Sequence, residues 1–270
     1  MPFTVVPATR FSCEQLTAML NDCFEGYSVP VLMSVSVFAQ RFGAEGLSLM
    51  DSCVWMDGDN PVAVAIITRR GQSARLAAFA IRPAYRGKGL GKKLLAPLMA
   101  ALGNDGVQEM WLEVISDNQP GVALYQSLGF TITQGLFGYQ GMQPGQATTR
   151  SLQETAVMPL VRTLMSASKE RLPWLMDPAT FITLPCRAFV HQQAYAVVSF
   201  LANKPQLRMI YVAPELRHRG QGREMLRALN QQFPALASVV SVPESFTTLF
   251  ASAGYMTMPI SQYEMRAALI

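Results

Sequence analysis

The sequence predicts an α/β protein with a mixed sheet, divided between two similar domains in tandem. Three observations lead to this prediction. Short apolar runs of strand length alternate with segments of helical periodicity in both halves of the chain. Pairs of these runs are joined by turn sequences such as Asp57-Gly58-Asp59-Asn60, which favour β-hairpins. A strand, a proline, an arginine and spaced glycines then occur twice, 131 residues apart and in the same order.

Length and composition agree with two folded domains. The chain has 270 residues, half of them hydrophobic and only 15% charged, so each half can form a core and long disorder is not expected. The net charge of +4 suits a small polyanion, but the long basic runs of a nucleic-acid-binding tail are missing. We therefore expect no nucleic-acid partner.

Cysteine and histidine usage argues against a metal site. The four cysteines lie far apart without a CxxC pair, and His191 and His218 are the only histidines, so we expect reduced thiols and no metal. The first residues do not resemble a signal peptide, and no apolar stretch approaches the roughly 18 residues that cross a bilayer. We expect a cytoplasmic protein without a membrane partner, whose oligomeric state does not follow from the sequence.

The pattern of the first half predicts strands and helices in alternation. Strands are expected at 3–6, 52–56, 61–68, 76–81, 110–115 and 130–133. Helices are expected after the capping box of Ser12 and Gln15, over 30–42, after Gly91, and after a cap at Asp117 or Asn118. Residues 135–149, rich in Gly, Gln and Thr, are expected to form a linker between domains at 1–145 and 150–270.

The second half is expected to follow the same order. A helix over 151–169 precedes strands at 188–190, 194–201, 207–212 and 239–242. Arg217, Gly220 and Gly222 correspond to Arg86, Gly89 and Gly91, and Ala253-Gly254-Tyr255 corresponds to Leu128-Gly129-Phe130. We interpret the two halves as a tandem duplication.

The clearest motif is the loop between the strand ending at Ile81 and the following helix. Its glycines let the backbone approach a ligand closely, and the helix N-terminus favours an anion. Five basic residues surround it: Arg82, Arg86, Lys88, Lys92 and Lys93. A dinucleotide-binding loop is the nearest alternative, but its third glycine would come one residue later and an acidic residue would follow. The loop predicts a phosphate site.

Arg86-x-x-Gly89-x-Gly91 resembles the acyl-CoA-binding signature of the GCN5-related N-acetyltransferase (GNAT) superfamily. The segment WLEVISDNQPGVALYQSLGF resembles a later motif of that superfamily, nearest in character to ribosomal-protein alanine acetyltransferases. The resemblance covers residues 3–140 well and 150–270 more weakly. It implies two tandem GNAT-like domains, each with a mixed sheet splayed between two strands, and acetyl-CoA as the cosubstrate.

The resemblance also implies a set of site residues. Pantothenate would lie along the strand at Phe79, Ala80 and Ile81. The pyrophosphate would contact amides of the loop, with nearby side chains: Arg86, Gly87, Lys88, Gly89, Leu90, Gly91 and Lys92. Carbonyl stabilisation would come from a backbone N–H of the Phe79–Ile81 segment.

Three further residues are candidates for the chemistry. Glu113 is the expected base, because an amine must lose a proton, although it could be an ordinary carboxylate on an alternating strand. Tyr125 is the expected acid for the leaving thiolate, although it could be a core tyrosine on an amphipathic helix. Asn118 could contact the pantetheine arm, cap its helix, or do both.

The second half lacks these candidates. When Gly254-Tyr255 is aligned with Gly129-Phe130, Phe250 stands at the position of Tyr125 and Pro243 at that of Asn118. No Leu-Glu-Val strand precedes them. Arg217, Gly220 and Gly222 could still form a second CoA site without turnover, or the loop could be a relic.

The predicted function is transfer of an acetyl group from acetyl-CoA to a primary amine, by direct attack and with the chemistry in the first domain. The acceptor, a protein or a small molecule, does not follow from the sequence. The alternative is a non-catalytic acyl-CoA sensor or scaffold protein.

Overall fold

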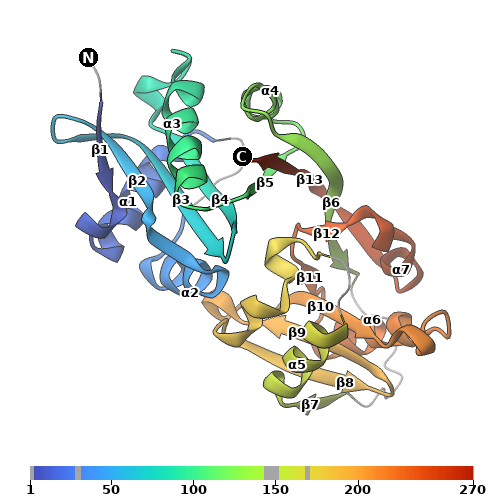
Figure 1. Cartoon of the computed structure of the whole chain (residues 1–270). Coiled ribbons are helices and arrows are strands. Elements are labelled where there is room, and N and C mark those ends of the chain that lie inside the picture. The colour runs from blue at the N-terminus through green and yellow to red at the C-terminus, as the bar shows by residue number, and fades with distance from the viewer. Residues whose placement is uncertain (1–2, 28–31, 143–151, 168–170, 270) are drawn as a thin grey trace. The chain divides into compact units, whose positions relative to one another are not determined.

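A computed structural model describes residues 3–27, 32–142, 152–167 and 171–269, which divide into two compact units (Figure 1). The first unit is Met1–Thr133 together with Glu264–Ile270, and the second is Gln134–Tyr263. These units differ from the contiguous ranges 1–145 and 150–270, because the end of the last strand belongs to the first unit.

The first unit is a mixed sheet with five strands of its own. They are β1 (Thr4–Pro7), β2 (Leu47–Asp57), β3 (Asn60–Arg70), β4 (Ser73–Ile81) and β5 (Glu109–Ile115). Neighbours from β1 to β4 are antiparallel, and β4 pairs with β5 in parallel. The expected hairpin turn after Asp57 joins β2 and β3.

The chain's last residues complete this sheet. The order continues from β5 to β13 (Tyr255–Ala268) and then to β6 (Thr131–Gly141). Within the first unit, the Thr133 hydroxyl donates to the Glu264 carbonyl (3.1 Å), and the Leu269 N–H donates to the Gln108 carbonyl (2.9 Å). The strand beside β5 is therefore supplied from more than 100 residues further along the chain.

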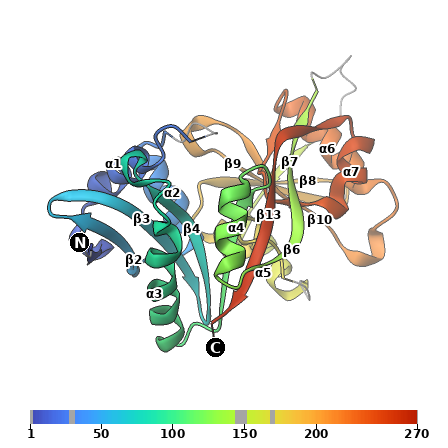
Figure 2. The ribbon, with the colours of Figure 1, turned by 90° about the horizontal axis from the view of Figure 1, so that it is seen from above.

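Four helices flank the first sheet: α1 (Cys13–Cys23), α2 (Val35–Glu45), α3 (Leu90–Asn104) and α4 (Gln119–Ser127). The capping box of Ser12 and Gln15 is confirmed at the start of α1. Helices α1 and α2 share a core with one face of β2–β4, and α3 lies on the opposite face (Figure 2). Helix α2 begins after the cap Ser34 rather than at residue 30; residues 28–31 lie outside the described chain.

The second unit repeats the arrangement with shorter strands. They are β7 (Gln153–Thr155), β8 (Cys186–His191), β9 (Ala194–Ser199), β10 (Gln206–Val212), β11 (Ala237–Ser238) and β12 (Val242–Pro243). Their order is β6-β11-β10-β9-β8-β7, with β12 also pairing with β6. The helices are α5 (Val157–Ala167), α6 (Gln221–Gln232) and α7 (Thr247–Ser252). The expected strand at 239–242 is thus replaced by two short segments.

The expected linker at 135–149 is wrong for residues 135–141, which belong to β6, whereas 143–149 lie outside the described chain. Glycines in β6 mark close contacts rather than flexibility. A Cβ at Gly138 would lie 2.7 Å from the Met258 sulfur, and one at Gly141 would lie 2.1 Å from the Asn230 Oδ1. Small residues are needed there because neighbouring side chains cross the strand.

Candidate active site in the first unit

The glycine loop lies between β4 and α3 and has the backbone that the sequence predicts. A short 3₁₀ turn, Pro83–Tyr85, leads to Gly87 and Gly89, whose φ values are +73° and +65°. These values lie in the left-handed region that glycine adopts without strain. Because Gly89 is the N-cap of α3, the first N–H groups of the helix have no intrahelical acceptor and face outward at the loop. The loop can therefore donate several hydrogen bonds to one anion.

Arg86 braces this loop with its side chain. Its Nε donates to the Ile81 carbonyl (2.8 Å), and its Nη2 donates to the carbonyls of Cys23 (2.8 Å) and Glu25 (2.7 Å) at the end of α1. A cation there also complements the negative end of the helix dipole. Among the five basic residues expected around the phosphate, Arg86 is thus engaged in positioning the loop, and Arg82 pairs with Asp22 (2.8 Å). Lys88 and Lys92 are exposed.

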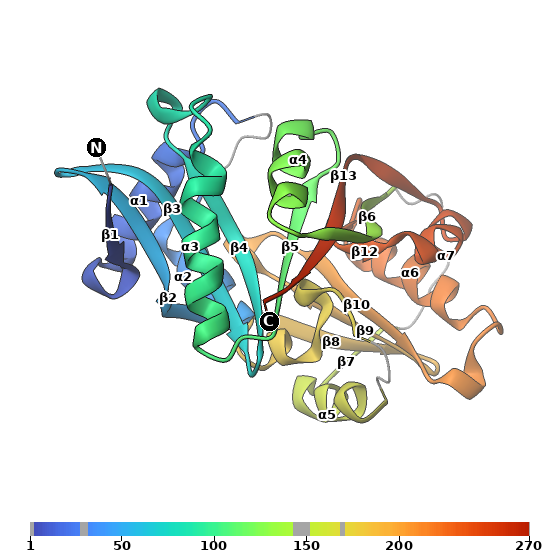
Figure 3. The same cartoon turned by 45° about the horizontal axis from the view of Figure 1, so that its top comes forward.

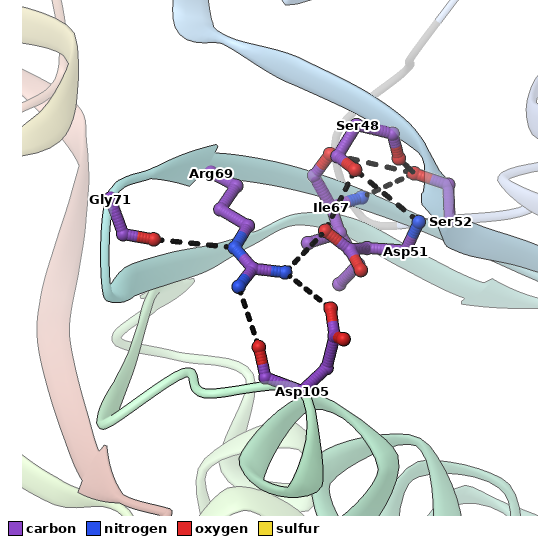
Figure 4. A network of polar contacts seen from close by, with 7 residues as sticks. All are labelled: Ser48, Asp51, Ser52, Ile67, Arg69, Gly71 and Asp105. Atoms are coloured by element: carbon purple, nitrogen blue, oxygen red, sulfur yellow. Dashed lines mark hydrogen bonds and ion pairs between the residues drawn. The ribbon is translucent and has the colours of Figure 1, made fainter.

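The far end of α3 is fixed as well (Figure 4). Arg69, on β3, pairs with the carboxylate of Asp105 (2.8 Å), donates to the Asp105 carbonyl (2.8 Å), and contacts Asp51 (3.4 Å). Asp105 is the C-cap of α3. The helix that carries the glycine loop is therefore held at both ends.

The strands β4 and β5 separate beside this loop. They pair over only three residues, ending at Arg75 and Trp111, and diverge toward the ends that lead to α3 and α4 (Figure 3). A β-bulge lies just beyond the last pair: Ala78 faces Ile66 and Leu76 faces Ile67, so Ala77 is an extra residue. A bulge bends its strand, which accounts for the separation. Phe79, Ala80 and Ile81 lie past the bulge, where β4 has left β5.

Tyr125 lies on α4, beyond the end of β5, and packs edge to face on Phe130 (5.9 Å between centroids). Burial, with a smaller contribution from the neighbouring Tyr27 phenol, raises the pKa of Tyr125 above that of a free tyrosine. The phenol therefore stays protonated at neutral pH, as a proton donor must. Helix α4 also packs closely on α3, because a Cβ at Gly91 would lie 2.7 Å from Leu124 Cδ2.

Asn118 is confirmed as the cap of α4 and also holds Tyr27. Its Oδ1 accepts from the Gly121 N–H (3.1 Å), and its Nδ2 donates to the Tyr27 hydroxyl (2.8 Å). Tyr27 follows α1 and packs on Phe24 (5.3 Å). Sequence reasoning did not place Tyr27 here, since it is 91 residues from Asn118 and carries no local motif. Together with Arg86, it fastens the end of α1 to both sides of the site.

Glu113 has a buried partner that the sequence did not indicate. Its carboxylate binds the Arg75 guanidinium at 2.6 Å and 2.7 Å, and Arg75 also binds Glu45 of α2 (2.8 Å). Both side chains of the Arg75–Glu113 pair are only 4% exposed. A base role for Glu113 stays a prediction, and this geometry weighs against it, because the carboxylate is already occupied by a cation and shielded from water.

The second unit reproduces the loop. His218 and Gly220 have φ values of +62° and +78°, matching Gly87 and Gly89, and Gly220 is the N-cap of α6. Arg217 Nε donates to the Val212 carbonyl (3.1 Å), just as Arg86 donates to Ile81. A Cβ at Gly222 would lie 3.2 Å from Leu249, the counterpart of the close approach at Gly91. Phe250 is buried and stacks on Tyr139 (4.2 Å).

Comparison with known proteins agrees with this geometry. Residues 14–130 match the profile of the acetyltransferase (GNAT) family. A putative acetyltransferase from Pyrococcus horikoshii has the same fold over 99% of this chain and 90% of its own, with a TM-score of 0.72 at 14% identity. Residues 14–130 thus belong to the GNAT family, and the whole chain has the fold of a GNAT acetyltransferase.

A tandem GNAT protein of the clavulanic acid biosynthesis pathway shares the fold over 99% of this chain and 98% of its own (TM-score 0.67, 15% identity). The two-domain GNAT fold expected from the sequence is thus confirmed. A ribosomal protein bS18-alanine N-acetyltransferase of Salmonella typhimurium is 37% identical over 89 residues, which are 33% of this chain and 60% of that enzyme. An uncharacterized protein of Mycobacterium leprae is 40% identical over 76 residues, 27% of this chain and 20% of its own.

The chain therefore matches less than two thirds of the length of these curated relatives. Among the described residues, no group of His, Cys, Asp or Glu side chains could hold a metal ion. No described helix has the length and apolarity needed to cross a membrane.

Proposed function

We propose that this GNAT protein transfers an acetyl group from acetyl-CoA to a primary amine, and that the first unit carries out the chemistry. The observation that carries the proposal is the position of Tyr125. Its protonated phenol lies on α4, which packs on the start of the glycine-loop helix through Leu124 and Gly91. A proton donor and an anion-binding loop thus flank the separated ends of β4 and β5.

In the proposed reaction, the amine nitrogen attacks the thioester carbonyl. A C–N bond forms, the C–S bond breaks, and the thiolate takes the proton of the Tyr125 hydroxyl. The nitrogen of the new amide releases one proton, and the Tyr125 phenolate regains a proton from solvent. The amine must arrive without its proton, and a lysine-like amine with a pKa of about 10.4 is neutral in only about one molecule in a thousand at pH 7. Because Glu113 is held by Arg75, we assign the amine proton to solvent and treat Glu113 as a structural residue.

Only the similarity to known proteins indicates which class of amine accepts the acetyl group. The Salmonella enzyme is named for the alanine of a ribosomal protein, so a protein N-terminus is the first acceptor to test. Lysine side chains, polyamines, amino acids and aminoglycosides present the same primary amine and complete the panel. We place the reaction in the cytoplasm, where acetyl-CoA is available.

The test is release of CoA from acetyl-CoA in the presence of each amine, followed by mass spectrometry of the product. Changing Tyr125 to Phe should lower turnover roughly 10- to 10⁴-fold, as expected for the loss of a general acid, while CoA binding persists. Unchanged turnover would remove Tyr125 from the mechanism. CoA binding without acetylation of any amine would favour the alternative, an acyl-CoA sensor or scaffold.

The role of Glu113 is tested in the same assay. Glu113→Gln keeps the shape of the side chain but removes its charge. If Glu113 is structural, the turnover of each folded variant molecule should depend on pH as in the wild type. The substitution should instead lower the stability of the protein. A flattened rise of turnover with pH would restore Glu113 as the base.

A further inference from the structure

The β-bulge of the first unit is repeated in the second, with a different residue. In β10, Leu207 faces Val198 and Met209 faces Val197, so Arg208 is the extra residue. Arg208 is the counterpart of Ala77, because the two residues are 131 positions apart, which is the offset between the two halves of the chain. The neighbouring parallel strands β10 and β11 pair only at Gln206 and Leu207, so their pairing ends before Arg208. The pairing of β4 with β5 likewise ends before Ala77. In both units the parallel strands therefore stop pairing before the bulge residue, but that residue is a small alanine in the first unit and a long arginine in the second.

Arg208 lies where β10 and β11 diverge, and it lines a small cavity there. Its side chain is buried, with the residue 6% exposed, and its Nε donates to the Ser199 hydroxyl (2.7 Å). The cavity lined by Arg208 is small. The centre of a water molecule can occupy about 20 Å³ of it, so it has room for about one water. The opposite wall comes from η7 (Glu244–Phe246) and α7: Phe246, Leu249 and Phe250.

The first unit has the same hydroxyl without the arginine. Thr68 faces Arg75 across the β3–β4 ladder, as Ser199 faces Gln206 across β9–β10, so Thr68 is the counterpart of Ser199. Thr68 is fully buried, and its Oγ1 has no hydrogen-bond partner among the described residues. A native buried hydroxyl is usually satisfied. Ala77 has no polar atom that could bond to this hydroxyl, whereas Arg208 donates to its counterpart Ser199.

We propose that the bulge residue decides which unit admits the pantetheine arm of CoA: Ala77 leaves the first cleft open, and Arg208 closes the second. The second loop keeps its phosphate-binding backbone, but a ligand whose arm must pass between β10 and β11 meets the Arg208 side chain. This inference rests on the proposed function, in that CoA is the ligand. It predicts one CoA site in each chain, although the glycine loop is present twice.

The experiment is titration calorimetry of CoA into the intact protein. We expect one site per chain. Ala77→Arg should weaken binding about 100-fold or more, since the new side chain takes the place of the ligand. Ala96→Arg is the matched control: it adds the same side chain at an exposed position of α3 and should bind like wild type.

The series Ala77→Ser, Ala77→Met and Ala77→Arg keeps the inference testable if the arginine variant does not fold. Affinity should fall in that order, with at least about a 10-fold loss for methionine, a clear overpacking effect. Two CoA sites in the wild type, or wild-type affinity in the folded methionine or arginine variant, would overturn the inference. No CoA binding at all in the wild type would instead refute the proposed function.

Discussion

At the scale of single residues, a buried ion network organises the start of the cleft. Arg75 of β4 joins Glu113 of β5 to Glu45 of α2, and Arg41 pairs with Glu45 (3.0 Å). The Arg75–Glu113 link lies just where the backbone ladder between the two strands ends. Side-chain hydrogen bonds between Arg75 and Glu113 thus link the two strands beyond the last backbone pair. They hold β5 in place where β4 bends away.

We expect Arg75→Met to lower the free energy of unfolding by about 3–5 kcal/mol, because it leaves the buried carboxylate of Glu113 without its cation and that of Glu45 with Arg41 alone. Urea unfolding at pH 7 measures the change. Arg82→Met is the matched control. Its partner Asp22 is half-exposed, so the loss should stay within about 1 kcal/mol. Equal losses in the two variants would mean that the network does not support the sheet.

Buried thiols make the folded chain sensitive to alkali. Burial raises the pKa of Cys53, on β2, to about 12, from the 9.0 of an ordinary cysteine thiol. Between these values the unfolded thiol loses its proton and the folded one keeps it, so stability is full below pH 9 and declines as pH rises toward 12.

Urea unfolding in a reducing buffer between pH 8 and pH 10 should therefore show a falling free energy of unfolding. Each such thiol contributes at most about 1.4 kcal/mol per pH unit. In Cys53→Ala the decline should be shallower, whatever the stability of that variant at pH 8. A slope that matches wild type would show that Cys53 does not titrate in this way.

At the scale of elements, the glycine loop and α3 work as one piece. Gly89 ends the loop in a left-handed conformation, Arg86 ties the loop to α1, and Arg69 ties the end of α3 to β3. These anchors are local to the first unit and keep the N–H groups at the start of α3 in one orientation. Preorganised donors bind an anion without the cost of ordering the loop.

Gly89→Val should abolish CoA binding measured by calorimetry, because the left-handed backbone is strained by a branched side chain and the loop donors shift. Gly106→Val is the matched control, since Gly106 is also left-handed (φ +82°) with open space at its Cβ, but it follows α3 instead of preceding it. Both variants should lose similar stability. Loss of binding in both would indicate general damage rather than a phosphate-binding loop.

At the scale of the whole molecule, the duplication is not a simple succession of two domains. The first unit takes the end of β13 from the far end of the chain, where Met265 and Ala267 are buried and Arg266 pairs with Glu109 (2.9 Å). The first unit therefore depends on the chain's last residues for a complete set of strands, and this unit alone has the residues proposed for chemistry.

Truncation after Tyr263 should destabilise the first unit by about 3 kcal/mol or more, through the lost burial of Met265 and the lost strand hydrogen bonds. Thermal unfolding measures this, and CoA binding should weaken with it. Arg266→Ala, which removes the partly exposed ion pair with Glu109 and the contact of the guanidinium with the Trp111 ring, should cost only about 1 kcal/mol. An unchanged melting temperature after truncation would show that the strand end is dispensable.

The sequence by itself determined the features that depend on neighbours in the chain. The capping box at Ser12, the left-handed glycines of the loop and the α4 cap at Asn118 each follow from contacts within a few residues. The duplication followed from the repeated spacing of Arg86, Gly89 and Gly91. The resemblance to the GNAT family followed from that loop and from the motif at residues 111–130.

Only the tertiary structure decided which distant residues meet. Glu113 finds Arg75, Tyr27 finds Asn118, and the end of β13 joins β5, all across long stretches of sequence. The bulges at Ala77 and Arg208 also depend on strand register, which no local pattern in β4 or β10 reveals. Side-chain partners and register are set by packing between elements, and packing is decided by the folded chain as a whole.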